Sequence, residues 1–194
     1  MKIECNLMQN FQNRTNGEVV IITGERNSGK TLFCLEFIEK MRTLDAAVKG
    51  IVSPGKYYDH EKTGILCKDI ASGEERLLAT FSPGWDPEKP EREWLFQPDI
   101  FKWGNKMLKK STPTEILVID ELGFMEFENK KGWSHAFEII PKGEYQIGLI
   151  VVRPIYVPLA KSLWNVKEII RLNNLSSVNE RVIRLIDNYH LDRR

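Results

Sequence analysis

The chain has 194 residues, a length that suits one domain with a substantial core. Its formal net charge is +1, so no global field draws the chain toward nucleic acid or an acidic membrane. Cys5, Cys34 and Cys67 are widely spaced and contain no Cys-x-x-Cys pair, which argues against a disulfide framework and a zinc site. The sequence shows no secretory apolar block and no apolar run that could span a bilayer, so we expect a cytoplasmic protein with no membrane partner.

The first half of the chain opens with a polar stretch, residues 1–17, that fits either a loose arm or a short edge strand. An unbroken apolar run at 17–23 then predicts a strand that is buried on both faces of a parallel sheet. Apolar residues at helical spacing follow and predict a helix that ends near Thr43. A second strand is expected at 48–53, where Pro54-Gly55 ends it.

The segment between this strand and helix reads Gly-Glu-Arg-Asn-Ser-Gly-Lys-Thr, the pattern of a phosphate-binding loop. Its two glycines allow backbone conformations that a Cβ would penalise, so the loop can turn its N–H groups toward an anion. We expect Lys30 to reach the β- and γ-phosphates and the Thr31 hydroxyl to hold a magnesium ion. The predicted nucleotide-binding residues are Gly24, Glu25, Arg26, Asn27, Ser28, Gly29, Lys30 and Thr31.

Residues 53–111 are too long and too varied for one simple crossover between strands. We interpret about 54–111 as a β-rich insertion plus a helix, packed over the nucleotide side of the sheet. The expected pieces are short strands within 56–70, 76–80 and 94–96, a loop rich in proline and glycine at 81–90, and a helix at 98–110.

A second informative stretch, residues 115–121, reads Glu-Ile-Leu-Val-Ile-Asp-Glu and has the Walker B pattern of a buried strand that ends in two acids. The carboxyl end of such a strand opens at the ligand crevice of an α/β sheet. We expect Asp120 to hold magnesium through an ordered water, and Glu121 to act as general base or to position the attacking water. The alternative is a strand end with two solvated acids, and the upstream phosphate loop argues against it.

Two further charged residues have open roles. Glu126 is close enough in sequence to serve the same crevice, but it fits a surface acid equally well. Arg153 ends a predicted strand at 145–152, where a positive charge would contact the γ-phosphate or, as the pattern slightly favours, form an ordinary surface ion pair. The remaining expected elements are helices at 132–140, 158–164 and 177–189 and a strand at 166–172.

The histidines and tryptophans indicate no other site. His60, His135 and His190 have neither metal-ligand spacing nor a neighbouring nucleophile. The five tryptophans are scattered and are not interleaved with basic runs, which argues against a nucleic-acid partner.

With these elements in place, the chain resembles the THEP-type nucleoside-triphosphatase family over about residues 19–186. The family's Val-Ile-Asp-Glu-Ile-Gly-x-Met-Glu signature stands here as Val-Ile-Asp-Glu-Leu-Gly-Phe-Met-Glu at 118–126, and the order of elements is also similar. Residues 62–65 depart from the Arg-x-Gly-Phe-like stretch common in the family, so the resemblance assigns them no role. The resemblance implies magnesium-dependent hydrolysis of nucleoside triphosphates with broad base tolerance and low turnover.

We therefore predict an α/β P-loop NTPase of the RecA-like type, formed by one domain at 1–194. It would have a mostly parallel five-stranded core sheet, helices on both faces and a strand between the two motif strands. Lys30 and Glu121 are the predicted catalytic residues, Thr31 and Asp120 the magnesium ligands, and a nucleoside triphosphate (ATP, GTP or another) the substrate.

Two other functions remain open. One is a nucleotide or small-molecule kinase, with the insertion covering a second substrate. The other is a non-catalytic, nucleotide-dependent switch that binds a protein partner. The chain contains neither an Asn-Lys-x-Asp guanine signature nor a Leu-Ser-Gly-Gly-Gln stretch, which disfavours a signalling GTPase and a transporter ATPase.

Overall fold

The computed structural model describes residues 17–81, 94–175 and 178–189. The expectations for residues 1–16 and for the loop at 82–90 lie outside these ranges. No helix in the described ranges is long and apolar enough to cross a membrane.

Five parallel strands form the centre of the sheet, in the spatial order β2, β7, β8, β1 and β9. Their bounds are β1 Glu18–Gly24, β2 Val48–Val52, β7 Ile116–Leu122, β8 Ile147–Val152 and β9 Val166–Leu172. These are the five predicted strands, and β8 lies between the two motif strands as predicted. Because parallel strands share a direction, the motifs that follow β1 and end β7 meet at one edge of the sheet.

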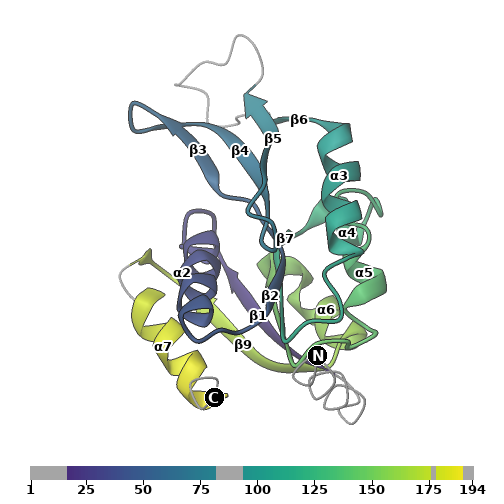
Figure 1. The fold of residues 1–194 in the computed structure, drawn as a ribbon. Coiled ribbons are helices and arrows are strands. Elements are labelled where there is room, and N and C mark those ends of the chain that lie inside the picture. The colour runs from purple at the N-terminus through teal and green to yellow at the C-terminus, as the bar shows by residue number, and fades with distance from the viewer. Residues whose placement is uncertain (1–16, 82–93, 176–177, 190–194) are drawn as a thin grey trace.

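Strand β1 shows why helices cover both faces of this core. Val20 and Ile22 pack into a cluster with helices α2 and α7, whereas Val19 and Ile21 pack into a second cluster with α3, α5 and α6. Successive side chains of a strand point to opposite faces, so an unbroken apolar run requires a helical layer on each side. Figure 1 shows α2 and α7 on one side of the sheet and α3, α5 and α6 on the other. The helix bounds are α2 Lys30–Thr43, α3 Pro98–Leu108, α5 Ala136–Ile139, α6 Val157–Leu163 and α7 Val178–Asn188.

The insertion widens this sheet. Between β2 and β7 in the chain lie α3 and four strands, β3 Gly55–Tyr58, β4 Glu61–Asp69, β5 Glu75–Phe81 and β6 Trp94–Phe96. Strand β4 pairs antiparallel with β2, and β3 and β5 both pair with β4, so the described residues form a nine-stranded mixed sheet. The strands therefore continue the edge of the core instead of forming a separate layer over it. In Figure 1 they project past the end of α2.

One local expectation was wrong in extent. The helix predicted at 132–140 is reduced to the single turn of α5, because Gly132 has a left-handed backbone with φ of +62° and residues before Ala136 form turns. A short helix that the sequence did not indicate, α4 Phe124–Phe127, directly follows β7. A 3-10 turn, η1 Pro154–Tyr156, leads into α6.

Candidate nucleotide-binding and catalytic site

A cleft of about 840 Å³ lies where β1 and β7 end. One side is formed by the predicted phosphate loop and the acids of β7, and the other by side chains of the insertion. Arg153 from the end of β8 and Leu175 from the segment after β9 also line it. A smaller pocket of about 470 Å³ lies between α2 and β4 and contains none of the predicted site residues.

The backbone of the phosphate loop depends on its two glycines. Gly24 has φ of +152° and Gly29 has φ of +96°, a range that side chains disfavour. A Cβ at Gly24 would lie 2.3 Å from the carbonyl oxygen of Leu172, so the loop also presses against β9. Helix α2 begins directly after Gly29, which places its unpaired N-terminal N–H groups at the cleft.

The Lys30 ammonium lies inside this loop. Its Nζ atom donates hydrogen bonds to the carbonyl oxygens of Gly24, at 2.9 Å, and Glu25, at 2.7 Å. An ammonium has three donors, so these two contacts leave one donor for a ligand. The lysine is therefore already held at the centre of the loop, where a phosphate would be bound.

Asp120 is the most buried acid of the cleft, with 1% of its surface exposed. Its Oδ2 atom accepts a hydrogen bond from the Ser53 backbone N–H at 3.2 Å, and the nearby Thr31 hydroxyl helps to stabilise the charged carboxylate. Burial, and next the negative charge of Glu121, raise the pKa of Asp120 to about 6. The structure thus places Thr31 and Asp120 in the same cleft, although they are 89 residues apart in the sequence.

These two residues fit a magnesium ion. A hydroxyl and a carboxylate are the hard oxygen ligands that Mg²⁺ prefers, and a cation would supply the positive charge that the buried Asp120 carboxylate lacks. Within the described ranges no three His, Cys, Asp or Glu side chains gather as a metal cluster. The other ligands of the ion would therefore be water and phosphate oxygens, as is usual for magnesium.

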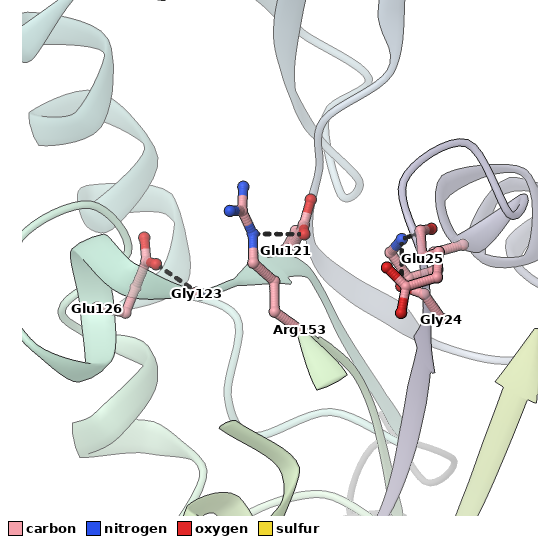
Figure 2. A network of polar contacts seen from close by, with 7 residues as sticks. Gly24, Glu25, Glu121, Gly123, Glu126 and Arg153 are labelled. Atoms are coloured by element: carbon pink, nitrogen blue, oxygen red, sulfur yellow. Dashed lines mark hydrogen bonds and ion pairs between the residues drawn. The ribbon is translucent and has the colours of Figure 1, made fainter. Parts of the chain in front are cut away.

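Glu121 and Arg153 form an ion pair at the mouth of the cleft. The Arg153 Nε atom donates to Glu121 Oε1 at 3.0 Å, and the two side chains are 58% and 37% exposed, respectively. Figure 2 shows the two side chains pointing toward one another. A Cβ at Gly123 would lie 2.9 Å from Arg153 Nε, so this glycine leaves room for the arginine. The partner of Arg153 is thus the predicted catalytic acid itself.

Glu126 is not a surface acid, since only 6% of it is exposed. Its carboxylate accepts hydrogen bonds from the backbone N–H groups of Gly123, at 2.9 Å, and Trp133, at 3.0 Å (Figure 2 shows the first). A Cβ at Gly132 would lie 1.9 Å from Glu126 Oε1, so the loop closes tightly around this carboxylate. Glu126 therefore fixes the segment after β7, and burial raises its pKa.

Sequence reasoning missed two residues of this cleft. Ser53 supports Asp120 through its backbone N–H, and its hydroxyl donates to the Asp120 carbonyl oxygen at 2.8 Å. A serine at the end of the strand beside the Walker B strand was a usable signal. Lys62 of β4 lines the cleft opposite the loop, and it stands where the family's Arg-x-Gly-Phe-like stretch has its arginine, a departure to which sequence reasoning gave no role.

Comparisons with known proteins agree with this geometry. A family model described as NTPase matches residues 19–182. The chain is 28% identical over 122 residues to nucleoside-triphosphatase THEP1 of Methanocaldococcus jannaschii, an alignment that covers 62% of this chain and 71% of that protein. It is 29% identical over 112 residues to nucleoside-triphosphatase THEP1 of Sulfurisphaera tokodaii, over 58% of this chain and 64% of that protein.

Two solved structures share the fold. The solution structure of a human cancer-related nucleoside triphosphatase matches with a TM-score of 0.63 and 17% identity, over 92% of this chain and 100% of that one. The crystal structure of THEP1 from the hyperthermophile Aquifex aeolicus matches with a TM-score of 0.52 and 16% identity, over 87% and 96% of the two chains. Because the family model spans most of the chain and the fold agrees, this protein belongs to the NTPase family of nucleoside-triphosphatases.

Proposed function

We propose that this nucleoside-triphosphatase hydrolyses the bond between the β- and γ-phosphates in a magnesium-dependent reaction and accepts several bases. One observation carries the proposal. A phosphate loop around Lys30 and two oxygen groups suited to a metal, the half-buried Thr31 hydroxyl and the buried Asp120 carboxylate, meet in one cleft with an acid, Glu121, at its mouth. Such a cleft supplies positioning and charge stabilisation, which dominate the catalysis of phosphoryl transfer.

Each residue of the cleft has a distinct task. The loop N–H groups and Lys30 hold the β- and γ-phosphates, while Thr31 and Asp120 hold the magnesium ion. When bound, the ion neutralises charge on the phosphate oxygens. Glu121 orients a water toward the γ-phosphorus and takes its proton as the new P–O bond forms and the bond to the β-phosphate oxygen breaks. Arg153 holds the Glu121 side chain in place through the ion pair at 3.0 Å.

The proposed base tolerance rests on Leu175. This side chain is 57% exposed, lines the cleft, and would contact a Cβ at Gly29 at 2.9 Å, so it lies directly beside the phosphate loop. An aliphatic side chain packs on any base but offers no donor or acceptor that would tell one base from another.

The test is phosphate release from ATP, GTP, CTP and UTP, with magnesium or with a chelator. We expect release from all four triphosphates with magnesium and background release with the chelator. Release that requires an added hydroxyl-bearing acceptor would instead support the kinase function. Tight binding without release of phosphate, with or without an acceptor, would support the switch.

A further inference from the structure

Lys62 reaches the cleft from the insertion along a defined path. It lies on β4 and is partly buried, and both Lys62 and Gly55 of the neighbouring strand β3 line the cleft. A Cβ at Gly55 would lie 3.0 Å from Lys62 Cε. The lysine side chain therefore passes directly over Gly55 toward the cleft, and a larger residue at position 55 would obstruct it.

The charge of Lys62 has no direct anionic partner among the described residues. Its Nζ atom lies over the Trp94 ring, 5.5 Å from the ring centroid. Burial, and next the positive charge of Arg26, lower the pKa of Lys62, whereas the negative charges of Asp120 and Glu121 act in the opposite direction. Lys62 is therefore within electrostatic range of both acids that end β7.

Two other cations of the cleft contact protein groups, and a third, Arg26, is exposed. Lys30 donates to loop carbonyl oxygens, and Arg153 forms its ion pair with Glu121. Lys62 thus combines partial burial with a positive charge that lines the cleft and has no anionic partner among the described residues. A buried charge without a partner is costly, and a bound anion would remove that cost.

The position of Lys62 indicates which part of a nucleotide it would contact. The loop cradles the α- and β-phosphates, whereas its lysine reaches the β- and γ-phosphates. The γ-phosphate end of the site is therefore the end at Asp120 and Glu121, the two acids whose charges act on Lys62. The nucleoside would extend the other way, toward Leu175.

We propose that Lys62 is a further catalytic residue, which contacts the terminal phosphate of the bound nucleoside triphosphate from the insertion. This inference rests on the proposed function of the cleft. The ammonium stabilises the negative charge on the γ-phosphate oxygens as the bond to the β-phosphate breaks. Once phosphate has left, the contact is lost, so Lys62 favours the triphosphate over the diphosphate. Through Lys62 the insertion then distinguishes a nucleotide that carries a γ-phosphate from one that lacks it.

The test compares Lys62→Met, which keeps the length of the side chain but removes its charge, with Lys62→Arg and Lys56→Met. Lys56 lies on β3, is exposed and does not line the cleft, so it controls for the loss of one positive charge on the insertion. Calorimetry would measure the dissociation constants of a non-hydrolysable ATP analogue and of ADP, both with magnesium. Single-turnover phosphate release from ATP would measure catalysis, and circular dichroism would verify folding.

For Lys62→Met we expect about tenfold weaker binding of the analogue, from one lost charge-assisted contact, with binding of ADP unchanged. Phosphate release should fall on the order of 10²-fold, as for other single groups that stabilise transition-state charge. Lys62→Arg should restore most of the preference for the triphosphate, and Lys56→Met should behave like the wild type.

If Lys62→Met bound the analogue and ADP more weakly by the same factor, the inference would be overturned, because Lys62 would then contact another part of the nucleotide. Wild-type binding and turnover in Lys62→Met would also overturn it. Lys62→Gln, which retains a polar group, repeats both tests if Lys62→Met is poorly folded. If the wild type released no phosphate, the proposed hydrolysis would fail, while the ratio of the two dissociation constants would still decide whether Lys62 contacts the terminal phosphate.

Discussion

The two walls of the cleft are built by different means. The phosphate-loop wall, formed by residues 24–31 and Asp120, is fixed by backbone contacts: Lys30 donates to two loop carbonyls, and Asp120 accepts from the Ser53 N–H. The insertion wall includes Gly55 and the side chains of Lys62, Trp94 and Phe96. The Lys62 ammonium lies 5.5 Å from the centroid of the Trp94 ring and has no ion pair among the described residues.

This difference gives the two walls different roles in recognising a nucleotide. Groups that the backbone already holds need little rearrangement to bind a ligand, so the phosphate-loop wall should determine affinity. A long side chain on an added strand can adjust to the charge in front of it, so the insertion wall should determine which phosphate state is recognised. Substitutions in the phosphate-loop wall should therefore weaken the binding of all nucleotides. Substitutions in the insertion wall should weaken the binding of the triphosphate alone.

The largest expected effect is at the centre of the phosphate-loop wall. Lys30→Ala should weaken the binding of both ATP and ADP by roughly 10²-fold or more, because the phosphate charge loses its buried partner. Lys40→Ala, near the other end of the same helix, is the matched control and should bind like the wild type. Calorimetry with magnesium present would measure both variants. Unchanged affinity in Lys30→Ala would refute the assignment of the phosphate loop.

A smaller effect, on stability alone, is expected at Glu126, which lines the cleft but is bound to backbone. Glu126→Gln replaces one acceptor oxygen with an amide that faces a buried N–H group, so it should lower the free energy of unfolding by about 2 kcal/mol. Turnover of the folded variant should stay close to that of the wild type. Urea unfolding and phosphate release would be compared with Glu138→Gln, an exposed control. A selective loss of turnover would move Glu126 into the chemistry.

The smallest effect concerns the pH dependence of the unfolding free energy, through the buried thiol of Cys67 on β4. Burial, and next the charge of Asp69, raise the pKa of Cys67 to about 12, whereas a thiol in the unfolded chain titrates near ~8.5. The unfolded state therefore loses this proton first, so the stability that the thiol contributes is complete below about pH 8.5 and declines toward pH 12, by up to about 1.4 kcal/mol per pH unit.

Cys67→Ala should therefore show a shallower decline of unfolding free energy between pH 8 and pH 10 than the wild type. Denaturant titrations at those two pH values would measure it. The substitution also removes a buried side chain, so the slope with pH, and not the absolute stability, is the quantity to compare. Identical slopes in the two proteins would show that Cys67 does not titrate differently on unfolding.

How much of the molecule the sequence could predict depends on the range of the interactions. The core strands were predictable because β1, β7 and β8 are largely apolar runs and β2 and β9 are short segments rich in Val and Ile with clear boundaries. The phosphate loop was predictable because its glycines serve a local turn. The wider sheet was not predictable in the same way, because it depends on the pairing of β4 with β2 at residues 51–52 and 68–69. The periodicity of the sequence does not identify β2 as the strand with which β4 pairs.

The residues of the site likewise differ in how far the sequence could predict their positions. Asp120 and Thr31 belong to two recognisable motifs, so the sequence could propose that they lie in one cleft. The burial of Glu126 depends on the left-handed turn at Gly132, which brings the Trp133 N–H back to the carboxylate. The place of Lys62 depends on the path of its side chain over Gly55, which no linear pattern records.

The central claim, that this cleft hydrolyses nucleoside triphosphates with Glu121 directing the water, is tested most directly by Glu121→Gln. Binding of a non-hydrolysable ATP analogue and magnesium-dependent phosphate release would be measured on the same preparations of wild type and variant. We predict binding within a few-fold of the wild type and phosphate release lower on the order of 10²-fold or more. Wild-type phosphate release by Glu121→Gln would contradict the account.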